Sequence, residues 1–195
     1  GAFAPSPLVD AAFDAQIMKE IVDPVIVGMA AEGHPFRGFL FVGLMLTPAG
    51  AKVIEFNARL GDPETQVILP RIDEALLPLL VAGAEGRLRA TACRIGSDKL
   101  VGVAIASRGY PDSSESGQPI RGIEHAERTA QVFHAGTALK NGELVTAGGR
   151  VLTVVGRGST FEDAIARAYA GVKEIHFEGM QYRTDIGKKA IDHAS

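Results

Sequence analysis

Acidic, amide and basic side chains crowd the stretch from Glu55 to Glu64, directly beside an apolar run. If residues 53–60 form a strand, successive side chains alternate between its two faces, so Glu55, Asn57 and Arg59 share one face. A carboxylate and an amide oxygen are hard donors of the kind that Mg²⁺ prefers beside waters and substrate phosphates. Glu55 and Asn57 are therefore candidate metal ligands, and the Arg59 guanidinium is a candidate contact for a phosphate or carboxylate oxygen.

The same alternation also fits the solvent-facing side of an ordinary antiparallel strand, where acids, amides and arginines are common. The opposite face, with Ile54 and Phe56, is expected to pack against the core. In the following loop, Asp62 could cap a helix that has Pro63 at its first position. A helix that starts directly after a metal-binding strand would aim backbone N–H groups at the same site, which suits an anionic substrate.

The hydrophobic pattern of the first half predicts the elements that position these residues. Residues 9–32 are predicted to form an amphipathic helix that is kinked or interrupted at Pro24. Residues 38–47 and 53–60 predict an antiparallel hairpin joined by a Pro/Gly turn. A further helix is predicted over residues 73–86.

The second half predicts a smaller, β-rich domain. Strands are predicted over residues 99–107, 131–134, 143–146 and 150–155, the second and third joined by a turn at 140–142. Ser159 and Glu162 have the residue types of a capping box, which predicts a helix running to about residue 175. The fold class is therefore α+β, with one domain over 1–95 and a second over 96–195.

Composition excludes several classes of partner. The chain has 195 residues, is 46% hydrophobic and carries a formal charge of -3, so bulk electrostatics favour neither nucleic acid nor an anionic membrane. No apolar run reaches the roughly 20 residues needed to span a bilayer. The single cysteine, Cys93, cannot form an internal disulfide, which fits a cytoplasmic location. The chain has no starting Met and opens on a Gly/Pro-rich loop, as expected for a piece of a longer protein; a cleaved tag or a processed start would look the same.

The polar row and its loop resemble the ATP-grasp ligases, in which Glu-x-Asn on a strand is followed two residues later by an arginine. The sequence RLGDPETQ at residues 59–66 is similar to the signature of the phosphoribosylamine–glycine ligase family, also called glycinamide ribonucleotide synthetases. Further blocks typical of the family follow in its order along nearly the whole chain, at residues 1–7, 38–41, 109–111, 134–137, 148–151 and 182–187.

The resemblance implies a fold and an activity. Residues 1–95 would be the C-terminal half of an ATP-grasp domain, an antiparallel sheet with helices, and residues 96–195 a small α+β C-terminal domain. The family joins glycine to 5-phosphoribosylamine in de novo purine biosynthesis, releasing ADP and phosphate through a glycyl phosphate. ATP and Mg²⁺ (or Mn²⁺) would be the co-substrate and cofactor, and the protein is expected to be a monomer.

The resemblance also implies roles for the residues of the opening stretch. Glu55 and Asn57 would hold the metal between the β- and γ-phosphates of ATP. Arg59 would stabilise the transferring phosphoryl group, while Asp62 and Glu64 would orient glycine or the amine.

A second group of candidates lies further along the chain. His134, Gly136 and Thr137 could contact the phosphoribosyl group through backbone N–H groups and the Thr137 hydroxyl, with Arg150 as an anion clamp. The alternative is a strand-end turn that holds a structural histidine.

Two departures from the family pattern limit these expectations. Many ATP-grasp enzymes place a further metal carboxylate about a dozen residues before the Glu of Glu-x-Asn, and here that position falls near Gly43. The family is also about twice this length, so its N-terminal half is an expected partner and the chain alone is expected to be inactive. Alternatives are another ATP-grasp carboxylate–amine ligase and a non-catalytic binding module derived from the fold.

Overall fold

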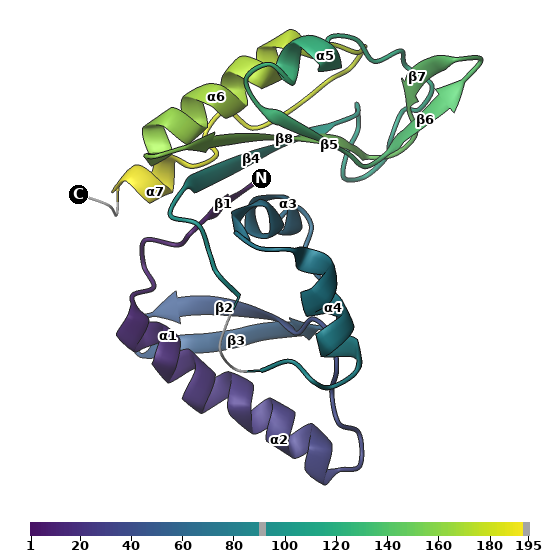
Figure 1. The fold of residues 1–195 in the computed structure, drawn as a ribbon. Helices are drawn as coiled ribbons and strands as arrows, with labels where there is room; N and C mark the ends of the chain where they lie inside the picture. Colours follow the sequence, from purple (N-terminus) through teal and green to yellow (C-terminus); the bar gives the residue numbers. More distant parts are fainter. Residues whose placement is uncertain (90–92, 193–195) are drawn as a thin grey trace. The chain divides into compact units, whose positions relative to one another are not determined.

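The computed structural model describes residues 1–89 and 93–192, and Figure 1 shows its fold. The chain divides into two compact units. Unit 1 comprises Gly1–Ser6, Asp62–Arg71 and Gly96–Ser195, and unit 2 comprises Pro7–Gly61 and Ile72–Ile95. Unit 1 thus includes two segments that precede residue 95, and the division into domains 1–95 and 96–195 stays a prediction. The mixture of helices and antiparallel strands confirms the predicted α+β class.

Unit 1 is built on a four-stranded antiparallel sheet. Its strand order is β1 (Ala2–Ala4), β4 (Lys99–Ala106), β8 (Arg150–Gly158) and β5 (Gln131–His134). The predicted strands that correspond to β4, β8 and β5 are confirmed, although β8 extends further along the chain than expected. The short strand β1 was not predicted.

The turn at residues 140–142 does not join the strands that the sequence suggested. It connects β6 (Thr137–Lys140) to β7 (Glu143–Thr146), while β5 pairs with β8. Asn141 and Gly142 have φ angles of 53° and 81°, as a two-residue hairpin turn with positive φ at both positions requires. Such a turn pairs the residues that flank it directly, so the prediction that it joins 131–134 to 143–146 was wrong.

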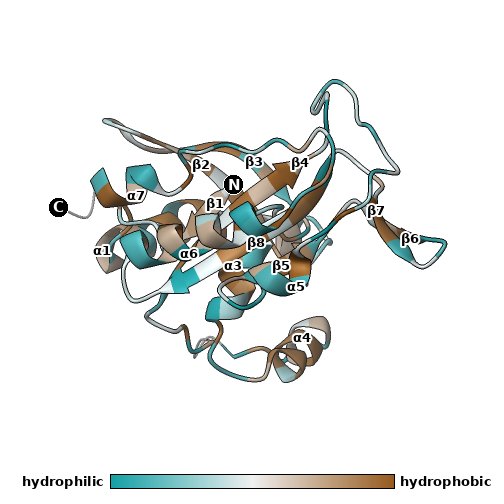
Figure 2. Ribbon diagram, turned by 90° about the horizontal axis from the view of Figure 1, so that it is seen from above, coloured by the Kyte–Doolittle hydropathy of each residue, from teal (hydrophilic) through white to brown (hydrophobic). Residues whose placement is uncertain are grey.

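One face of this sheet packs against helix α6 (Phe161–Glu174), as Figure 1 shows. Along β4, Val101, Val103 and Ile105 alternate toward this helix and are fully buried, and Figure 2 shows the hydrophobic colour of the strand. The helix approaches β8 closely at Gly156, where a Cβ atom would lie 2.0 Å from the Ala164 carbonyl oxygen. Only glycine permits this contact.

The cap of α6 lies one residue later than the sequence suggested. Thr160 is the N-cap, and its hydroxyl accepts a hydrogen bond from the Asp163 N–H at 3.2 Å. Ser159 instead donates from its hydroxyl to the Asp163 carboxylate at 3.2 Å. The predicted capping box of Ser159 and Glu162 was wrong because Thr160 and Asp163 have the same spacing and equivalent chemistry.

The other face of the sheet carries helix α3 (Thr65–Ile68), which continues into the 3-10 turn η2 (Leu69–Arg71). Val67 of α3 is 1% exposed and packs with Leu100 and Val155. The loop that precedes α3 is thereby fixed to unit 1. Two short helices complete this unit, α5 (Ile123–Ala126) and α7 (Lys188–Asp192). No helix in the described part of the chain is long and apolar enough to cross a membrane.

Unit 2 contains the predicted helix and hairpin. The helix runs as α1 (Ala11–Ile17), a π-helical stretch η1 (Met18–Val22) and α2 (Asp23–Ala31), with Pro24 at the start of α2. A proline inside a helix removes a hydrogen bond to the residue four positions earlier, and the wider π turn directly before Pro24 accommodates this loss. The predicted interruption at Pro24 is confirmed.

The hairpin pairs β2 (Phe41–Thr47) with β3 (Gly50–Asn57). Helix α4 (Leu76–Ala84) starts three residues later than predicted, because Ile72 bridges to Ile95 and the Asp73 N–H donates to the Arg94 carbonyl. These two contacts hold the preceding residues in an extended conformation.

The expectation that Ile54 and Phe56 face the core was wrong. Ile54 is 62% exposed and Phe56 43% exposed. A register shift pairs Gly43 with Glu55 and Leu44 with Val53, so Ile54 is left opposite no residue, as in a β-bulge. The sheet of unit 2 has only two strands, which offer too little area to bury apolar side chains on both faces.

Candidate functional site

The end of β3 brings together the two candidate metal ligands. Glu55 and Asn57 lie on the same face, and the Asn57 Nδ2 donates a hydrogen bond to the Glu55 Oε1 at 2.9 Å. Glu55 is exposed and Asn57 half-buried. The predicted alternation is thus confirmed for these two side chains, since β3 is regular from Glu55 to Asn57.

The pair has the chemistry of a magnesium site. Glu55 offers a carboxylate, and turning the Asn57 amide by half a turn would place its oxygen where the nitrogen now lies. Both side chains could then ligate one cation with oxygen atoms, and Mg²⁺ takes its remaining ligands from water and substrate phosphates. Within the described residues, no group of three or more His, Cys, Asp or Glu side chains is placed to hold a metal.

Gly43 lies directly opposite Glu55 in the hairpin. A Cβ atom built on Gly43 would lie 3.1 Å from the Glu55 Cγ, so a side chain at this position would share the face of the candidate ligands. Glycine adds no donor there, which leaves Glu55 and Asn57 as the ligands that this hairpin can offer.

Arg59 follows the end of β3 and is exposed. Its Nη1 donates a hydrogen bond to the carbonyl oxygen of the neighbouring Leu60 at 2.9 Å. The Arg59 guanidinium is thus turned toward the neighbouring backbone, and its place in one row with Glu55 and Asn57 stays a prediction.

Asp62 is held by an arginine from a distant part of the sequence. The Arg150 Nη2 lies 3.1 Å from the Asp62 Oδ2, and the Arg150 Nη1 donates to the Asp62 carbonyl oxygen at 3.1 Å. Gln66 Nε2 also approaches the Asp62 Oδ1 at 3.4 Å, while the buried Gln66 Oε1 has no partner in the described structure. Arg150 thus ties the loop before α3 to the start of β8.

Glu64, and not Asp62, occupies the N-cap position of α3, and its side chain makes no capping hydrogen bond. The suggested helix cap at Asp62 was therefore wrong. The helix is only four residues long, too short to present a substantial dipole to an anion. Any role of Asp62 and Glu64 must rest on their side chains.

The segment from His134 to Thr137 uses its backbone N–H groups internally. The N–H groups of Ala135, Gly136 and Thr137 donate to the carbonyls of Val151, Arg150 and Ala135. These three N–H groups thus already have backbone acceptors, and their contact with a substrate stays a prediction. The side chains remain as candidates, and the His134 Nδ1 lies 3.1 Å from the Thr137 hydroxyl.

Gly136 has a packing reason for its small size. A Cβ atom there would lie 2.7 Å from the Arg150 carbonyl oxygen and 2.8 Å from the Gly148 Cα. Gly136 therefore allows the His134 segment to lie close to the strand that carries Arg150. It has no side chain that could contact a ligand, and its N–H donates to the Arg150 carbonyl.

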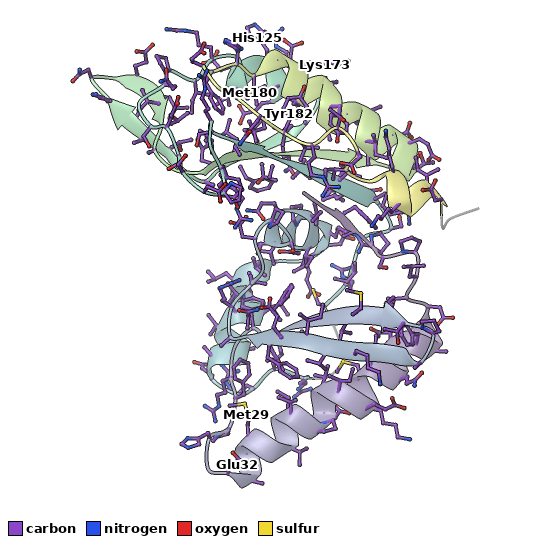
Figure 3. All side chains as sticks on the ribbon, turned by 180° about the vertical axis from the view of Figure 1, so that it is seen from behind. Met29, Glu32, His125, Lys173, Met180 and Tyr182 are labelled. Carbon is purple, nitrogen blue, oxygen red and sulfur yellow. The ribbon has the colours of Figure 1, made fainter. Side chains whose placement is uncertain are left out.

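Unit 1 also contains a cavity of ≈ 440 Å³ beside Arg150. Its walls include Tyr110, Gln181, Tyr182 and Arg183, and Figure 3 labels Tyr182 in the C-terminal segment. Arg183 makes a two-bonded ion pair with Asp185, at 2.9 Å from Nε and 2.6 Å from Nη2. These hydrogen bonds hold the pKa of the Asp185 carboxyl below its ordinary value.

The sequence patterns did not indicate these wall residues as a site. Their signal was present in the blocks at residues 109–111 and 182–187, which contain Tyr110, Tyr182 and Arg183. The two blocks are separated by some seventy residues, so only the folded chain shows that they border one cavity with Arg150.

Two family models match the chain. The model of the phosphoribosylglycinamide synthetase ATP-grasp (A) domain matches residues 1–65, and that of the phosphoribosylglycinamide synthetase C domain matches residues 100–189.

Relatives with established names agree with these models. The chain is 45% identical to the phosphoribosylamine–glycine ligase of Rhizobium meliloti, over 98% of this chain and 45% of that protein. It is 47% identical to the ligase of Xanthomonas axonopodis, again over 98% and 45%. The crystal structure of phosphoribosylamine–glycine ligase from Thermotoga maritima has a TM-score of 0.81 at 36% identity, covering 94% of this chain and 45% of that one. This chain therefore spans less than half the length of these relatives.

Proposed function

Because this chain belongs to the phosphoribosylglycinamide synthetase family, we propose that it takes part in the ATP-dependent ligation of glycine to 5-phosphoribosylamine. In this reaction the γ-phosphoryl group of ATP moves to the glycine carboxylate, which gives an acyl phosphate and ADP. The sugar amine then attacks the carbonyl carbon, a C–N bond forms and phosphate leaves as glycinamide ribonucleotide is made. The observation that carries the proposal is the contact of Glu55 with Asn57 on β3, directly before the RLGDPETQ loop.

Glu55 and Asn57 would hold a divalent cation, Mg²⁺ or Mn²⁺, which when bound would neutralise charge on the phosphates of ATP. The two side chains come from the regular end of one strand, so their spacing is set by the backbone and only the Asn57 amide must turn. Catalysis of this kind depends on positioning and on charge neutralisation more than on a covalent enzyme intermediate.

Arg59 would leave the Leu60 carbonyl and place its guanidinium on the transferring phosphoryl group. Asp62 would orient the ammonium group of glycine or the sugar amine, because its carboxylate accepts hydrogen bonds and Arg150 fixes its position. Glu64, two residues later and half-buried, would support the same role.

We also propose that the chain is not a competent ligase by itself. It spans 45% of the Rhizobium meliloti relative, and its hairpin offers only two metal ligands, Glu55 and Asn57, so the groups that clamp ATP would come from the other part of the ligase. A monomer in the cytoplasm, acting in purine biosynthesis, is the setting that we propose.

The test joins this chain to the first half of the Rhizobium meliloti relative and measures ADP release. Release should require both glycine and 5-phosphoribosylamine together with a divalent cation. Glu55→Gln and Asn57→Ala should each reduce the rate by at least about tenfold, since each removes a charged or oxygen ligand. Glu32→Gln is the control, because Glu32 is an exposed acid at the end of α2 (Figure 3). Unchanged metal dependence in both β3 variants would refute the metal assignment.

A further inference from the structure

We propose that Gln66 is a positioning residue for the reaction, which holds the Asp62 carboxylate through its Oδ1 atom while Arg150 holds Oδ2. The inference rests on the proposed function, in which Asp62 orients the amine that reacts. Gln66 is the last residue of the RLGDPETQ loop and has no part in the metal or phosphate contacts proposed above.

The two oxygen atoms of the Asp62 carboxylate have different partners. The Gln66 Nε2 donates to Oδ1 at 3.4 Å, and the Arg150 Nη2 lies 3.1 Å from Oδ2. The torsion that turns an aspartate carboxylate has only a broad preference, so a single donor leaves the plane of the group free to rotate. Two donors on different oxygens also fix that plane. The direction of the Asp62 oxygens therefore depends on Gln66 as well as on Arg150.

The backbone of Gln66 is fixed by the residue that follows it. Val67 is 1% exposed and packs on Leu100 and Val155, which holds α3 on the sheet of unit 1. Asp62 lies in the turn directly before α3, four residues from Gln66. This is the spacing at which helical side chains meet. The Gln66 side chain thus reaches Asp62 from a fixed starting point.

The oxygen of the Gln66 amide is placed at a cost in stability. This Oε1 atom is buried and has no hydrogen-bond partner in the part of the chain that the structure describes. A buried acceptor without a donor loses its hydration and gains no bond in return. An apolar side chain of the same length would avoid this cost. The glutamine is therefore explained by the contact that its Nε2 atom makes, and not by packing.

The orientation of the amide follows from the same contact. If the amide were turned by half a turn, its oxygen would face the Asp62 carboxylate and its NH₂ group would take the buried position. That arrangement brings two acceptors together and buries two donors. The observed orientation is the better of the two, so the buried oxygen is a consequence of holding Asp62.

The test uses Gln66→Met in the joined ligase, the chain fused to the first half of the Rhizobium meliloti relative. Methionine has a similar length and helix propensity but no donor, so the contact with Asp62 is lost. We expect kcat/KM to fall by about tenfold for whichever of glycine and 5-phosphoribosylamine is oriented by Asp62. KM for ATP should stay unchanged. Gln66→Glu should lose at least as much activity, because it turns a like charge toward Asp62.

A double-mutant cycle tests whether Gln66 acts through Asp62. With Asp62→Ala already present, Gln66→Met should lower kcat/KM by less than about twofold further, since the group that it positions has gone. A tenfold loss in both backgrounds would show that Gln66 acts independently of Asp62, and would overturn the proposal.

Gln16→Met is the matched control. Gln16 also lies on a helix, and its Nε2 also donates to a carboxylate four residues away, that of Glu20, at 3.1 and 3.2 Å. Gln16 is exposed and lies far from the RLGDPETQ loop in the sequence. Gln16→Met should keep wild-type kinetics. Equal losses in Gln16→Met and Gln66→Met would count against a special role of Gln66 and overturn it.

Unfolding in urea separates positioning from a structural role. In the 195-residue chain, the urea midpoint of Gln66→Met should equal or exceed that of wild type, because the variant removes a buried acceptor that has no donor. A residue that only held the fold would show the reverse. A midpoint clearly below that of wild type would assign Gln66 to packing and overturn the proposal.

Failure of this inference can be distinguished from failure of the proposed function. An active joined ligase in which Gln66→Met matches wild type would keep the ligase and reject the positioning role. A joined wild-type protein that releases no ADP would reject the ligase. The side-chain amide signal of Gln66 in the NMR spectrum of the chain then decides the contact: it should shift in Asp62→Ala while that of Gln16 does not, and an unmoved Gln66 signal would overturn the contact.

Discussion

At the scale of single residues, the contact of Arg150 with Asp62 changes the role expected of Arg150. An arginine predicted to clamp a substrate anion makes two contacts, at 3.1 Å each, with the side chain and backbone of one loop residue. Both side chains are partly exposed, at 38% and 45%, so the pair contributes little to stability. Its effect lies in fixing where the Asp62 carboxylate stands.

Arg150→Gln should therefore impair activity more than stability. In the joined ligase we expect kcat/KM to fall by about 10- to 100-fold, because small displacements of a positioning group are costly in catalysis. The free energy of unfolding should change by less than about 1 kcal/mol. Arg157→Gln is the matched control, since Arg157 also lies on β8 and contacts a carboxylate, that of Asp98, and the Pro70 carbonyl. Equal losses of kcat/KM in the two variants would refute the role of Arg150.

Tyr169 allows a prediction about pH. Burial raises the pKa of Tyr169 above its ordinary value, although the hydrogen bond from the Ile186 N–H acts in the opposite direction. The folded protein thus holds this proton more tightly than the unfolded chain. The resulting stability is complete below the ordinary pKa of about 10 and is lost as the pH rises through the folded-state pKa.

The free energy of unfolding should therefore fall as the pH rises above about 10, and less steeply in Tyr169→Phe. Tyr169→Phe should also be less stable at neutral pH by about 1–3 kcal/mol, since the Ile186 N–H loses its acceptor. Urea unfolding at several pH values measures both effects. A Tyr169→Phe slope equal to that of wild type would contradict the assignment.

At the scale of elements, helix α6 shows how a local motif and tertiary packing combine. Its apolar residues Phe161, Ala164, Ala168 and Val172 recur at helical spacing and are all buried against the sheet. The helix is capped by Thr160, which places Phe161 to pack edge-on against Phe3, with the two ring centroids 5.7 Å apart. The cap and this contact therefore set the start of the helix together.

Thr160→Ala and Ser159→Ala distinguish the two possible caps. Thr160→Ala should destabilise unit 1 by about 1 kcal/mol, because the Asp163 N–H loses its acceptor. Ser159→Ala should cost only a few tenths of a kcal/mol, since it removes an exposed side-chain contact. Chemical denaturation of the two variants measures the difference, and a larger loss in Ser159→Ala would restore the cap that the sequence suggested.

At the scale of the whole molecule, the two units differ in how they bury apolar surface. Both clusters of buried hydrophobic residues lie in unit 1. In the described part of unit 2, no hydrophobic side chain is fully buried, and Val27, Ile54 and Leu77 are each more than 60% exposed. Stability that rests on burial is therefore concentrated in unit 1.

Hydrogen exchange should show this asymmetry. Backbone amides of β4, β8 and α6 should exchange more slowly than those of β2 and β3 by more than about an order of magnitude, because opening the hairpin exposes little additional apolar surface. Mass spectrometry of peptides from the exchanged chain measures both sets in one experiment, so each serves as the control for the other. Equal protection would indicate that unit 2 gains stability from a source other than its own core.

The sequence by itself determined the longer helices and strands and the chemistry at the end of β3. Local patterns of residue type sufficed for the hairpin, for α6 and for the shared face of Glu55 and Asn57, because each depends on neighbours within a few residues. The RLGDPETQ loop also sufficed to predict the family.

Only the tertiary structure decided which distant segments meet. The pairing of β5 with β8, the contact of Arg150 with Asp62 and the cavity beside Arg183 join residues far apart in the chain. Such contacts depend on where small residues such as Ala104 leave space and where glycine permits close approach. No local pattern encodes these distances, because they arise only when the whole sheet is assembled.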